Sequence, residues 1–541
     1  MIFPAPDPVR AARYRAAGHW RHETIPALIE ASAQRTPEKI AIRDASGKAL
    51  TYAALIEAAS RFSGFLAAKG IGRGDIVTAC LPNWCETVIG FLGIMRIGAV
   101  VNPVPVTYGR ADIAYVTKKC ASKALLLPVS FRSTDYNALI DDLAPELPAG
   151  IALLQVGEGA TRPTLAEALR AEPAALAATM RADDPVAVLF TSGTESRPKG
   201  AVHTHNTILF GERALATALG VDDRDIAFMA SPISHTTGFM HGVIMTLTLG
   251  GTLSLLDQFE GKRAANQMRD HACTWTMGAT PFLADVATAL AAENTRLSAL
   301  RYYLCGGAPI PEALVKRAAE VEIRTLAIYG STESPPHTMV HPEDPEENTW
   351  TTDGRPLAGI EVRIVGDGGI DLPAGEIGEE YSRGPNTFLG YLGEPDLTAK
   401  DFDAEGWYHS SDLARMLPDG SVRISGRLKD IIVRGGQNIS VREIEDYLIA
   451  HPSVQMVVVV GVPHARLGET GCAVIVPKPG TAPTLAEITD YLLALGVARF
   501  KLPERLELWS ELPQTPSGKI QKFLIRQKLN NSDHKSSEPT P

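Results

Sequence analysis

Short apolar runs typical of strands alternate with segments of helical periodicity through most of the chain. The predicted strands include residues 75–80, 185–190, 301–305 and 325–329, and the predicted helices include residues 87–97, 207–219 and 312–321. Because such alternation is typical of parallel strands joined by helical crossovers, it predicts parallel sheets with helices on both faces. The chain has no repeat of fixed period and no heptad run. The pattern therefore favours a large α/β domain.

The texture of the sequence changes at about Gly359. Short strands between glycine-rich turns follow at residues 360–365, 378–382 and 421–425, and they indicate a small β subdomain. After the turn GRLKD the predicted helices are residues 441–450 and 485–495, and the predicted strands are residues 455–461 and 472–476. We therefore divide the chain into a large domain of residues 1–428, a small mobile α+β domain of residues 429–530 and a disordered polar tail of residues 531–541.

One uncharged stretch, residues 236–256, is long enough to cross a bilayer. It is rich in Thr and Gly and contains His241, so we interpret it as a buried helix–turn–strand segment and expect no integral membrane segment. The N-terminus has no apolar core of signal-peptide length.

Composition excludes several classes of protein. Hydrophobic residues make up 45% of the 541 residues and charged residues 21%, which is ordinary for a globular protein and not for a disordered or collagenous one. The formal net charge is −10, whereas a nucleic-acid-binding protein usually has an excess of basic residues. The six cysteines form no C-x-x-C pair, so we expect reduced thiols in a cytoplasmic protein.

The strongest local signal is the segment LFTSGTESRPKG, residues 189–200, which follows a predicted strand and precedes a predicted helix. Hydroxyls and free backbone N–H groups at the carboxyl end of a strand suit phosphate oxygens, and Lys199 adds a positive charge. The segment does not match the P-loop of NTPases, because Pro198 and Gly200 flank this lysine. On composition alone, a polar surface turn explains the segment equally well.

Two more turns directly follow predicted strands. YGSTES, residues 329–334, places a carboxylate beside hydroxyls, which suits Mg²⁺ shared with nucleotide phosphates, and its tyrosine can cover a base. CGGAP, residues 305–309, has paired glycines that permit close approach of the backbone to a flat ligand. We expect these turns and the phosphate segment to lie at strand ends of one sheet, where they would form a ligand crevice.

Two C-terminal segments add polar groups. Asp412 at the end of WYHSSD can accept hydrogen bonds from ribose hydroxyls, and Arg427 can donate to them. In PQTPSGKI, residues 513–520, Lys519 could cap a reacting carboxylate and phosphate. Taken alone, this lysine would be an ordinary exposed residue of a basic segment.

In this order and spacing, the five segments resemble those of the adenylate-forming superfamily of acyl-CoA synthetases, amino-acid adenylation domains and beetle luciferases. The resemblance runs from about residue 22 to residue 529. The blocks GATPFLADV, LRYYLCGGAPIP, GEEYSRGPNTFLGY and KDIIVRGGQNIS are most similar to bacterial short- and medium-chain acyl-CoA synthetases. The resemblance implies ATP, Mg²⁺ and coenzyme A as partners of a small carboxylic acid.

The resemblance also implies roles for individual residues. Phosphate contacts fall to Thr191, Ser192, Gly193, Thr194 and Lys199, and the adenosine and α-phosphate contacts to Gly307, Ala308, Tyr329, Gly330, Ser331, Thr332, Asp412 and Arg427. Glu333 supports the metal, Lys429 is the interdomain hinge, and Lys519 bridges the acid and the α-phosphate. His235, Gly306 and Gly436 border the acyl and pantetheine passages. The catalytic residues are then Lys519, Glu333, Thr332 and Lys199.

Three positions depart from the family pattern. Glu195 stands in place of a hydroxyl residue and Ser196 in place of a glycine in the phosphate segment, and Ser411 stands where glycine is usual before Asp412. We expect Glu195 to point away from the triphosphate, since a carboxylate facing it would be repelled.

The residues leave several functions open. An amino-acid adenylation domain that loads a carrier protein usually has an Asp near His235, and none is present here. A non-catalytic relative would lack Lys519 or Glu333, and a luciferase-like oxygenase is not separated by these motifs.

The candidate acyl-pocket residues are His235, Met240, Trp275, Met277, Phe282 and Ala308. Apolar pockets discriminate by only ~1–3 kcal/mol per methylene, so we expect a range of short, medium or cyclic acids. A homodimer is the common default for oligomeric state.

Overall fold

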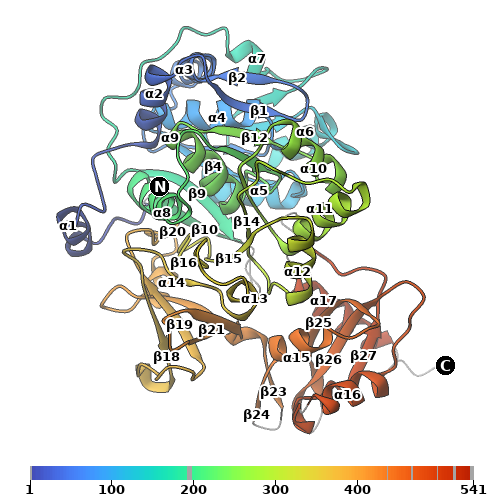
Figure 1. Cartoon of the computed structure of the whole chain (residues 1–541). Helices are drawn as coiled ribbons and strands as arrows, with labels where there is room; N and C mark the ends of the chain where they lie inside the picture. The colour runs from blue at the N-terminus through green and yellow to red at the C-terminus, as the bar shows by residue number, and fades with distance from the viewer. Residues whose placement is uncertain are drawn as a thin grey trace.

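The computed structural model describes residues 3–191, 198–434, 437–464, 467–495, 497–515 and 520–535. Figure 1 shows a large N-terminal part, coloured blue to orange, and a smaller C-terminal part in red. The chain passes from one to the other through η4 (Leu428–Asp430), a single 3-10 turn between β22 (Val422–Arg427) and β23 (Ile431–Arg434).

Seven strands form the first sheet, in the order β20-β10-β9-β4-β3-β5-β8. Their bounds are β3 (Ile76–Ala79), β4 (Val100–Pro103), β5 (Ala124–Pro128), β8 (Ala152–Val156), β9 (Pro185–Thr191), β10 (Lys199–Thr204) and β20 (Gly390–Tyr391). The strands from β9 to β8 pair in parallel, whereas β10 runs antiparallel to both β9 and β20. Every residue of β3, β4 and β5 is buried, as expected for strands covered on both faces.

Nine strands form the second sheet, in the order β17-β16-β15-β14-β13-β11-β12-β1-β2. Their bounds are β1 (Ile40–Asp44), β2 (Ala49–Thr51), β11 (Ile226–Met229), β12 (Thr252–Leu255), β13 (Trp275–Gly278), β14 (Tyr302–Cys305), β15 (Thr325–Tyr329), β16 (Thr338–Met339) and β17 (Arg355–Pro356). The central strands are parallel and the pairs at the two edges are antiparallel.

Helices cover these sheets (Figure 1). The helices of the large part are α1 (Pro8–Ala16), α2 (Ile25–Arg35), α3 (Tyr52–Ala68), α4 (Cys85–Arg96), α5 (Arg110–Lys119), α6 (Tyr136–Leu143), α7 (Leu165–Ala168), α8 (His205–Leu219), α9 (Thr246–Leu249), α10 (Gly261–Asp270), α11 (Thr280–Glu293), α12 (Glu312–Glu320), α13 (Asn348–Thr351) and α14 (Pro395–Lys400), of which α1 projects from the rest. Shorter elements are β6 (Ser130–Phe131), β7 (Thr134–Asp135), η1 (Ala144–Glu146) and η3 (Asp367–Gly369).

Helix α4 joins the two sheets. It contacts β3 and β4 of the first sheet and β1 of the second, and every residue except Glu86 is buried. A single apolar cluster contains side chains from both sheets, among them Val77 and Leu326. The two sheets therefore share one core.

A four-stranded antiparallel sheet forms the β subdomain, with β18 (Glu361–Val365), β19 (Gly378–Arg383) and β21 (Tyr408–Met416) beside β22. The small C-terminal part has β24 (Gln437–Ser440), β25 (Val454–His464), β26 (Gly468–Pro477) and β27 (Arg505–Leu508) next to β23, and the 3-10 turn η5 (Arg499–Lys501). Its helices are α15 (Val441–Leu448), α16 (Leu485–Ala494) and α17 (Lys522–Lys535). The predicted fold class, a large α/β domain with a β subdomain and a small α+β domain, is confirmed.

Four details of the prediction need correction or refinement. The phosphate segment does not link a strand to a helix, because β10 follows it and pairs back on β9. The three predicted ligand turns do not end strands of one sheet, since the phosphate segment follows β9 of the first sheet and the other two follow β14 and β15 of the second. Residues 236–256 form a buried helix–turn–strand segment, but its helix begins with the π-helix η2 (Thr237–Met245). Helix α17 extends past residue 531 into the segment that we expected to be a disordered tail.

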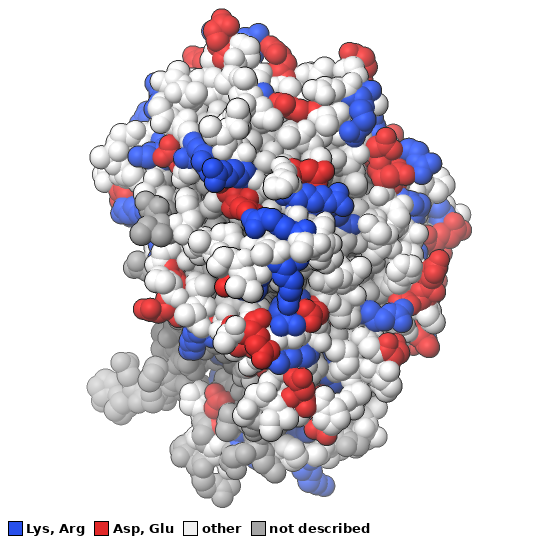
Figure 2. Space-filling model, turned by 90° about the vertical axis from the view of Figure 1, so that its left-hand side faces the viewer, with Lys and Arg blue, Asp and Glu red and all other residues white. Residues whose placement is uncertain are grey.

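Acidic and basic side chains are interspersed on the face shown in Figure 2. Acidic and basic side chains of the surface also form ion pairs, such as Arg73 Nη2 with Asp184 Oδ1 at 2.6 Å. Within the described residues, no helix is long and apolar enough to traverse a bilayer.

Candidate functional site

Tyr329, Asp412 and Arg427 meet where the second sheet borders the β subdomain. The Tyr329 hydroxyl donates to Asp412 Oδ2 at 2.5 Å, and Arg427 Nε lies 2.8 Å from Asp412 Oδ1. Asp412 is buried and lies opposite Arg427 in the pairing of β21 and β22. The Asp412 carboxylate raises the pKa of the Arg427 guanidinium, and burial raises the pKa of Tyr329. Three of the predicted adenosine contacts, Tyr329, Asp412 and Arg427, therefore form one polar group, which we call the adenosine group.

Ser411, just before Asp412, has a left-handed backbone with φ of 59°. The pairing of β21 with β19 shifts register here, and the Ser411 N–H donates to Glu379 Oε1 at 3.1 Å. A side chain in this conformation costs roughly 1–2 kcal/mol, a penalty that glycine avoids. The departure from the family glycine is thus a strained position that presents Asp412.

We predict that Ser411→Gly stabilises the large domain without loss of activity. The relief of left-handed strain exceeds the extra chain entropy of glycine, so the net gain is about 0.5–1 kcal/mol. Denaturant unfolding followed by near-ultraviolet circular dichroism measures it. Ser410→Gly is the control and should be destabilising, because Ser410 Oγ donates to the Glu380 carbonyl at 2.7 Å and accepts the Asp412 N–H at 3.0 Å. A midpoint for Ser411→Gly at or below that of the wild type would contradict the assignment.

Glu333 lies in a second polar group with Tyr391. The Tyr391 hydroxyl is 2.9 Å from Glu333 Oε1 and 3.1 Å from Asp401 Oδ2. The Lys199 ammonium lies 5.2 Å from the centre of the Tyr391 ring, within range of a cation–π contact. Burial raises the pKa of Glu333. The structure thus brings two of the predicted catalytic residues to one tyrosine, Lys199 over the ring and Glu333 at the hydroxyl.

Thr332 is held between two elements of the large domain. Its carbonyl lies 2.8 Å from Nε2 of His203 on β10, and its hydroxyl accepts from Thr236 at 3.2 Å. Burial lowers the pKa of His203 to about 4, so the neutral ring donates through Nε2. Ser331 Oγ accepts the Ser334 N–H at 3.1 Å. These contacts position the turn that carries Glu333.

Sequence reasoning missed Tyr391, Asp401 and His203. Tyr391 ends the block GEEYSRGPNTFLGY but was given no role, Asp401 lies beyond the predicted motifs, and His203 is typical of an ordinary strand residue. No signal in a single sequence marks them, because their importance comes from pairings with distant segments.

The two glycines after β14 are required for different reasons. A Cβ at Gly306 would lie 2.4 Å from the Ile328 carbonyl oxygen, so this position is closed by the neighbouring strand rather than by a ligand. Gly307 has φ of 83° and open space around it. The backbone at Gly307 leaves room for a flat group, and the adenine contacts of Gly307 and Ala308 stay a prediction.

The candidate acyl-pocket residues lie around η2 and β13. His235 is exposed in the loop before η2, where its carbonyl accepts the Phe239 N–H at 2.8 Å. Met240 and Trp275 are almost fully buried, and Phe282 stacks on Phe259 with ring centres 4.0 Å apart. Of the other two, Met277 lies within β13, next to its last residue, and Ala308 lies in the turn after β14.

The hinge candidate Lys429 lies between two anchors. On one side, Arg427 is paired with Asp412 in the large part. On the other side, Asp430 Oδ1 lies 2.8 Å from Arg526 Nη2, and its Oδ2 lies 3.8 Å from Lys522 Nζ. Leu428 and Lys429 form the backbone link between these two ion pairs.

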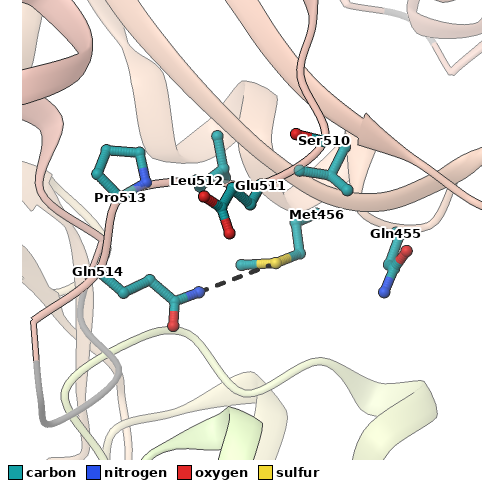
Figure 3. A pocket seen from close by; sticks show the side chains of 8 residues that line it. Gln455, Met456, Ser510, Glu511, Leu512, Pro513 and Gln514 are labelled. Atoms are coloured by element: carbon teal, nitrogen blue, oxygen red, sulfur yellow. Dashed lines mark hydrogen bonds between the residues drawn. The ribbon is translucent and has the colours of Figure 1, made fainter. Parts of the chain in front are cut away.

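Ser192, Gly193, Thr194, Gly436 and Lys519 lie outside the described residues. The described flanks of the Lys519 loop include Gln514 and Ile520, which form an isolated β-bridge. A surface pocket of about 450 Å³ adjoins this loop and is lined by Gln455, Met456, Val476, Ser510, Glu511, Leu512, Pro513 and Gln514. In Figure 3 the Gln514 amide points to Met456, at 3.9 Å from its Sδ. None of the predicted site residues lines this pocket.

The fold is that of adenylate-forming enzymes. The ATP-bound structure of MatB from Rhodopseudomonas palustris superposes with a TM-score of 0.85 at 27% identity, over 94% of this chain and 100% of that one. Residues 29–392 match the AMP-binding enzyme family, and residues 443–519 match the AMP-binding enzyme C-terminal domain. The chain belongs to the AMP-binding enzyme family, as an AMP-forming acid–CoA ligase.

Two relatives span nearly the whole chain. The medium-chain fatty-acid–CoA ligase of Escherichia coli (strain K12) is 41% identical over 525 residues, which cover 96% of this chain and 93% of the relative. A CoA ligase of Rhodococcus jostii (strain RHA1) for a methyl-dioxo-octahydroindenyl propanoate is 32% identical over 521 residues, covering 93% of this chain and 98% of the relative.

Proposed function

We propose that the carboxylic acid is a medium-chain fatty acid, activated as acyl-adenylate and then transferred to coenzyme A. The observation that carries this choice is the 41% identity to the Escherichia coli ligase over 96% of the chain. The apolar surroundings of η2, where Met240 and Trp275 are buried, support an apolar acyl group. A cyclic acid is the second candidate, supported by the Rhodococcus relative.

In this proposal each polar group serves one part of ATP. Tyr329, Asp412 and Arg427 bind adenosine, because a carboxylate fixed by Arg427 is ready to accept from ribose hydroxyls. Lys199 neutralises phosphate charge that develops while the acid attacks the α-phosphorus. Activation is needed because a carboxylate has no good leaving group, whereas AMP is one.

Mg²⁺ fits the group around Glu333. This cation is usually bound by one or two carboxylates together with substrate phosphates. Glu333 is a buried carboxylate with one oxygen fixed by Tyr391, and the Thr332 hydroxyl precedes it in the same turn. When bound, the metal would supply positive charge beside the phosphates. Burial and Tyr391 keep the carboxylate in one orientation.

A carrier-protein adenylation enzyme is the alternative. It is less supported, because the most similar relative reported above is a CoA ligase. We also propose a cytoplasmic location, supported by six buried cysteines that form no disulfide within the described residues, and a homodimer as the default assembly.

The test is a panel of acids of graded chain length together with cyclic acids. ATP–pyrophosphate exchange measures adenylation, and thioester formation with CoA measures transfer. We expect the highest kcat/KM for medium-chain acids. Exchange without thioester formation would favour the carrier alternative, and a preference for cyclic acids would replace the medium-chain assignment.

We predict that Glu333→Gln slows adenylation and that extra Mg²⁺ partly restores it. The amide preserves the acceptor for Tyr391 but loses the charge that binds the cation. Tyr391→Phe should keep the charge but raise the Mg²⁺ requirement ~10–100-fold, as expected for removal of a group that orients a metal ligand. Exchange rates against Mg²⁺ concentration measure both effects. Tyr408→Phe, in the same aromatic cluster, is the control and should leave the requirement unchanged. If neither Glu333→Gln nor Tyr391→Phe shifts the Mg²⁺ dependence, the metal site is elsewhere.

A further inference from the structure

A buried acid–base pair lies behind the adenosine group. His337 Nε2 and Glu380 Oε1 face each other at 3.5 Å, and both side chains are fully buried. Within the described residues, neither that nitrogen nor either carboxylate oxygen of Glu380 has a hydrogen-bond partner. Since buried polar groups are nearly always satisfied, the pair needs a proton between its two members.

The surroundings decide which member carries that proton. His337 Nδ1 lies 2.8 Å from the carbonyl oxygen of Ser334, which can only accept, so Nδ1 is protonated. In the neutral ring Nε2 is then an acceptor, and the facing oxygen must be the donor. Burial lowers the pKa of His337 to about 4 and raises the pKa of Glu380 to about 8. Both shifts favour a neutral carboxylic acid that donates to a neutral imidazole.

The His337–Glu380 pair is linked to two residues of the adenosine group, Tyr329 directly and Asp412 through Ser410. The His337 ring packs edge-on against Tyr329, with ring centres 4.6 Å apart and planes at 84°, and the backbone N–H of His337 donates to the Tyr329 carbonyl oxygen at 3.1 Å. Glu380 lies at the register shift between β19 and β21, opposite the segment that presents Asp412. There Ser410 links the two strands, because its hydroxyl donates to the Glu380 carbonyl and accepts the Asp412 N–H.

The charges around Glu380 are mostly negative. Burial raises its pKa most, the Ser410 hydroxyl opposes that rise, and Asp412 and Glu379 add to it. His337, with a lowered pKa, and Tyr329, with a raised one, are neutral neighbours. Arg427 is the cation of this group, and it is already paired with Asp412. Ionisation of Glu380 would therefore place an uncompensated charge beside Asp412 and remove the donor that His337 needs.

We propose that neutral Glu380 and His337 act as a positioning pair that holds Tyr329 and Asp412 in the geometry that binds the nucleotide. The inference rests on the proposed adenosine site. It extends that proposal to two residues that do not touch the nucleotide, and it makes nucleotide affinity dependent on a proton at Glu380.

Binding of AMP tests the pair independently of the acid substrate and of CoA. Calorimetry would give Kd for AMP between pH 7.5 and 9.5, where the phosphate is fully ionised, for the wild type, Glu380→Gln and Glu380→Met. The neutral acid is present below a pKa of about 8 and is lost as pH rises through it. The wild-type Kd should therefore rise on the order of tenfold across this range.

The two variants separate positioning from bulk. The amide of Glu380→Gln can still donate to His337, so its Kd should match the wild type at pH 7.5 and stay flat with pH. Glu380→Met has similar bulk but no donor, and its Kd should be raised on the order of tenfold at every pH, since an unsatisfied buried acceptor remains. In turnover, KM for ATP should rise while kcat and KM for the acid stay within about threefold. Ile364→Val, at a buried apolar position of β18 in the same sheet, controls for general destabilisation and should leave the pH dependence intact.

The outcomes are distinct. A Glu380→Gln profile that rises with pH like the wild type would overturn the role of the Glu380 proton, and a Glu380→Met Kd equal to the wild type would overturn the positioning role. If AMP binds with the expected pH dependence but no medium-chain acid yields a thioester, the substrate assignment fails and the pair stands. A wild type that does not bind AMP would overturn the adenosine site and this inference together.

Discussion

Lys519→Ala should depress adenylation by ~10²–10³-fold, the usual effect of losing one preorganised donor to developing charge. We propose that the small part takes two poses about the link at Lys429, one for adenylation and one for transfer to CoA. In the first pose the Lys519 ammonium donates to the acid and to α-phosphate oxygens, whose charge grows in the transition state. Transfer from a supplied acyl-adenylate to CoA should be nearly spared, because the small part then presents another face to the site. Pyrophosphate exchange and thioester release from chemically made adenylate measure the two steps separately.

A nearby lysine provides a matched control. Lys528 on α17 lies 5.2 Å from the Trp509 ring centre, and Lys528→Ala removes the same charge from the same segment. It should leave both steps within about twofold, as expected for a surface substitution worth less than ~0.5 kcal/mol. If Lys519→Ala makes thioester as poorly from adenylate as from ATP and acid, the two-pose mechanism is wrong for this chain.

Lys429→Pro should give the opposite pattern, with exchange largely intact and CoA transfer strongly impaired. Proline fixes φ near −65°, and rotation of the small part requires backbone change in the link between the two anchors, Arg427–Asp412 and Asp430–Arg526. That link has only Leu428 and Lys429 to absorb the change. Single-turnover assays of the two half-reactions measure the effect.

Lys429→Ala separates the backbone from the side chain. It keeps φ free, so both half-reactions should proceed as in the wild type if the hinge acts through the main chain. Equal loss of both half-reactions in Lys429→Pro would instead indicate damage to folding, and intact transfer would place the hinge elsewhere.

Strands and helices with strong periodicity were predictable. The strand predicted at residues 325–329 has these bounds in β15 (Thr325–Tyr329), and the helix predicted at 312–321 is α12 to within one residue. The strand β10 was not predictable, because KGAVHT has no apolar alternation and its buried His203 is satisfied by Thr207 and Thr332. The π-helix η2 could not be predicted from the sequence either, because nine residues are too few to distinguish its periodicity from that of an α-helix.

Some residues of the candidate site were also predictable from the sequence and others were not. Tyr329, Asp412 and Arg427 were predicted from turn position and side-chain chemistry, and the structure brings them into contact. Tyr391, His337 and Glu380 were missed, because they support the site through partners far away in sequence. Glu380 in particular reads as a surface charge of a β-strand, and burial of such a residue follows from tertiary structure alone.

Helix α4 contributes to the stability of the large part but lies outside the link whose motion catalysis requires. Because it is buried between both sheets, the large part behaves as one solid block, and the proposed motion is confined to the link at Leu428 and Lys429. Substitutions that tighten the packing around α4 should therefore lengthen the working life of the enzyme at high temperature without slowing its alternation between poses. Stabilising substitutions usually risk a loss of activity. Here we expect that loss only for substitutions at the link, so the core around α4 is the better place to raise thermal stability.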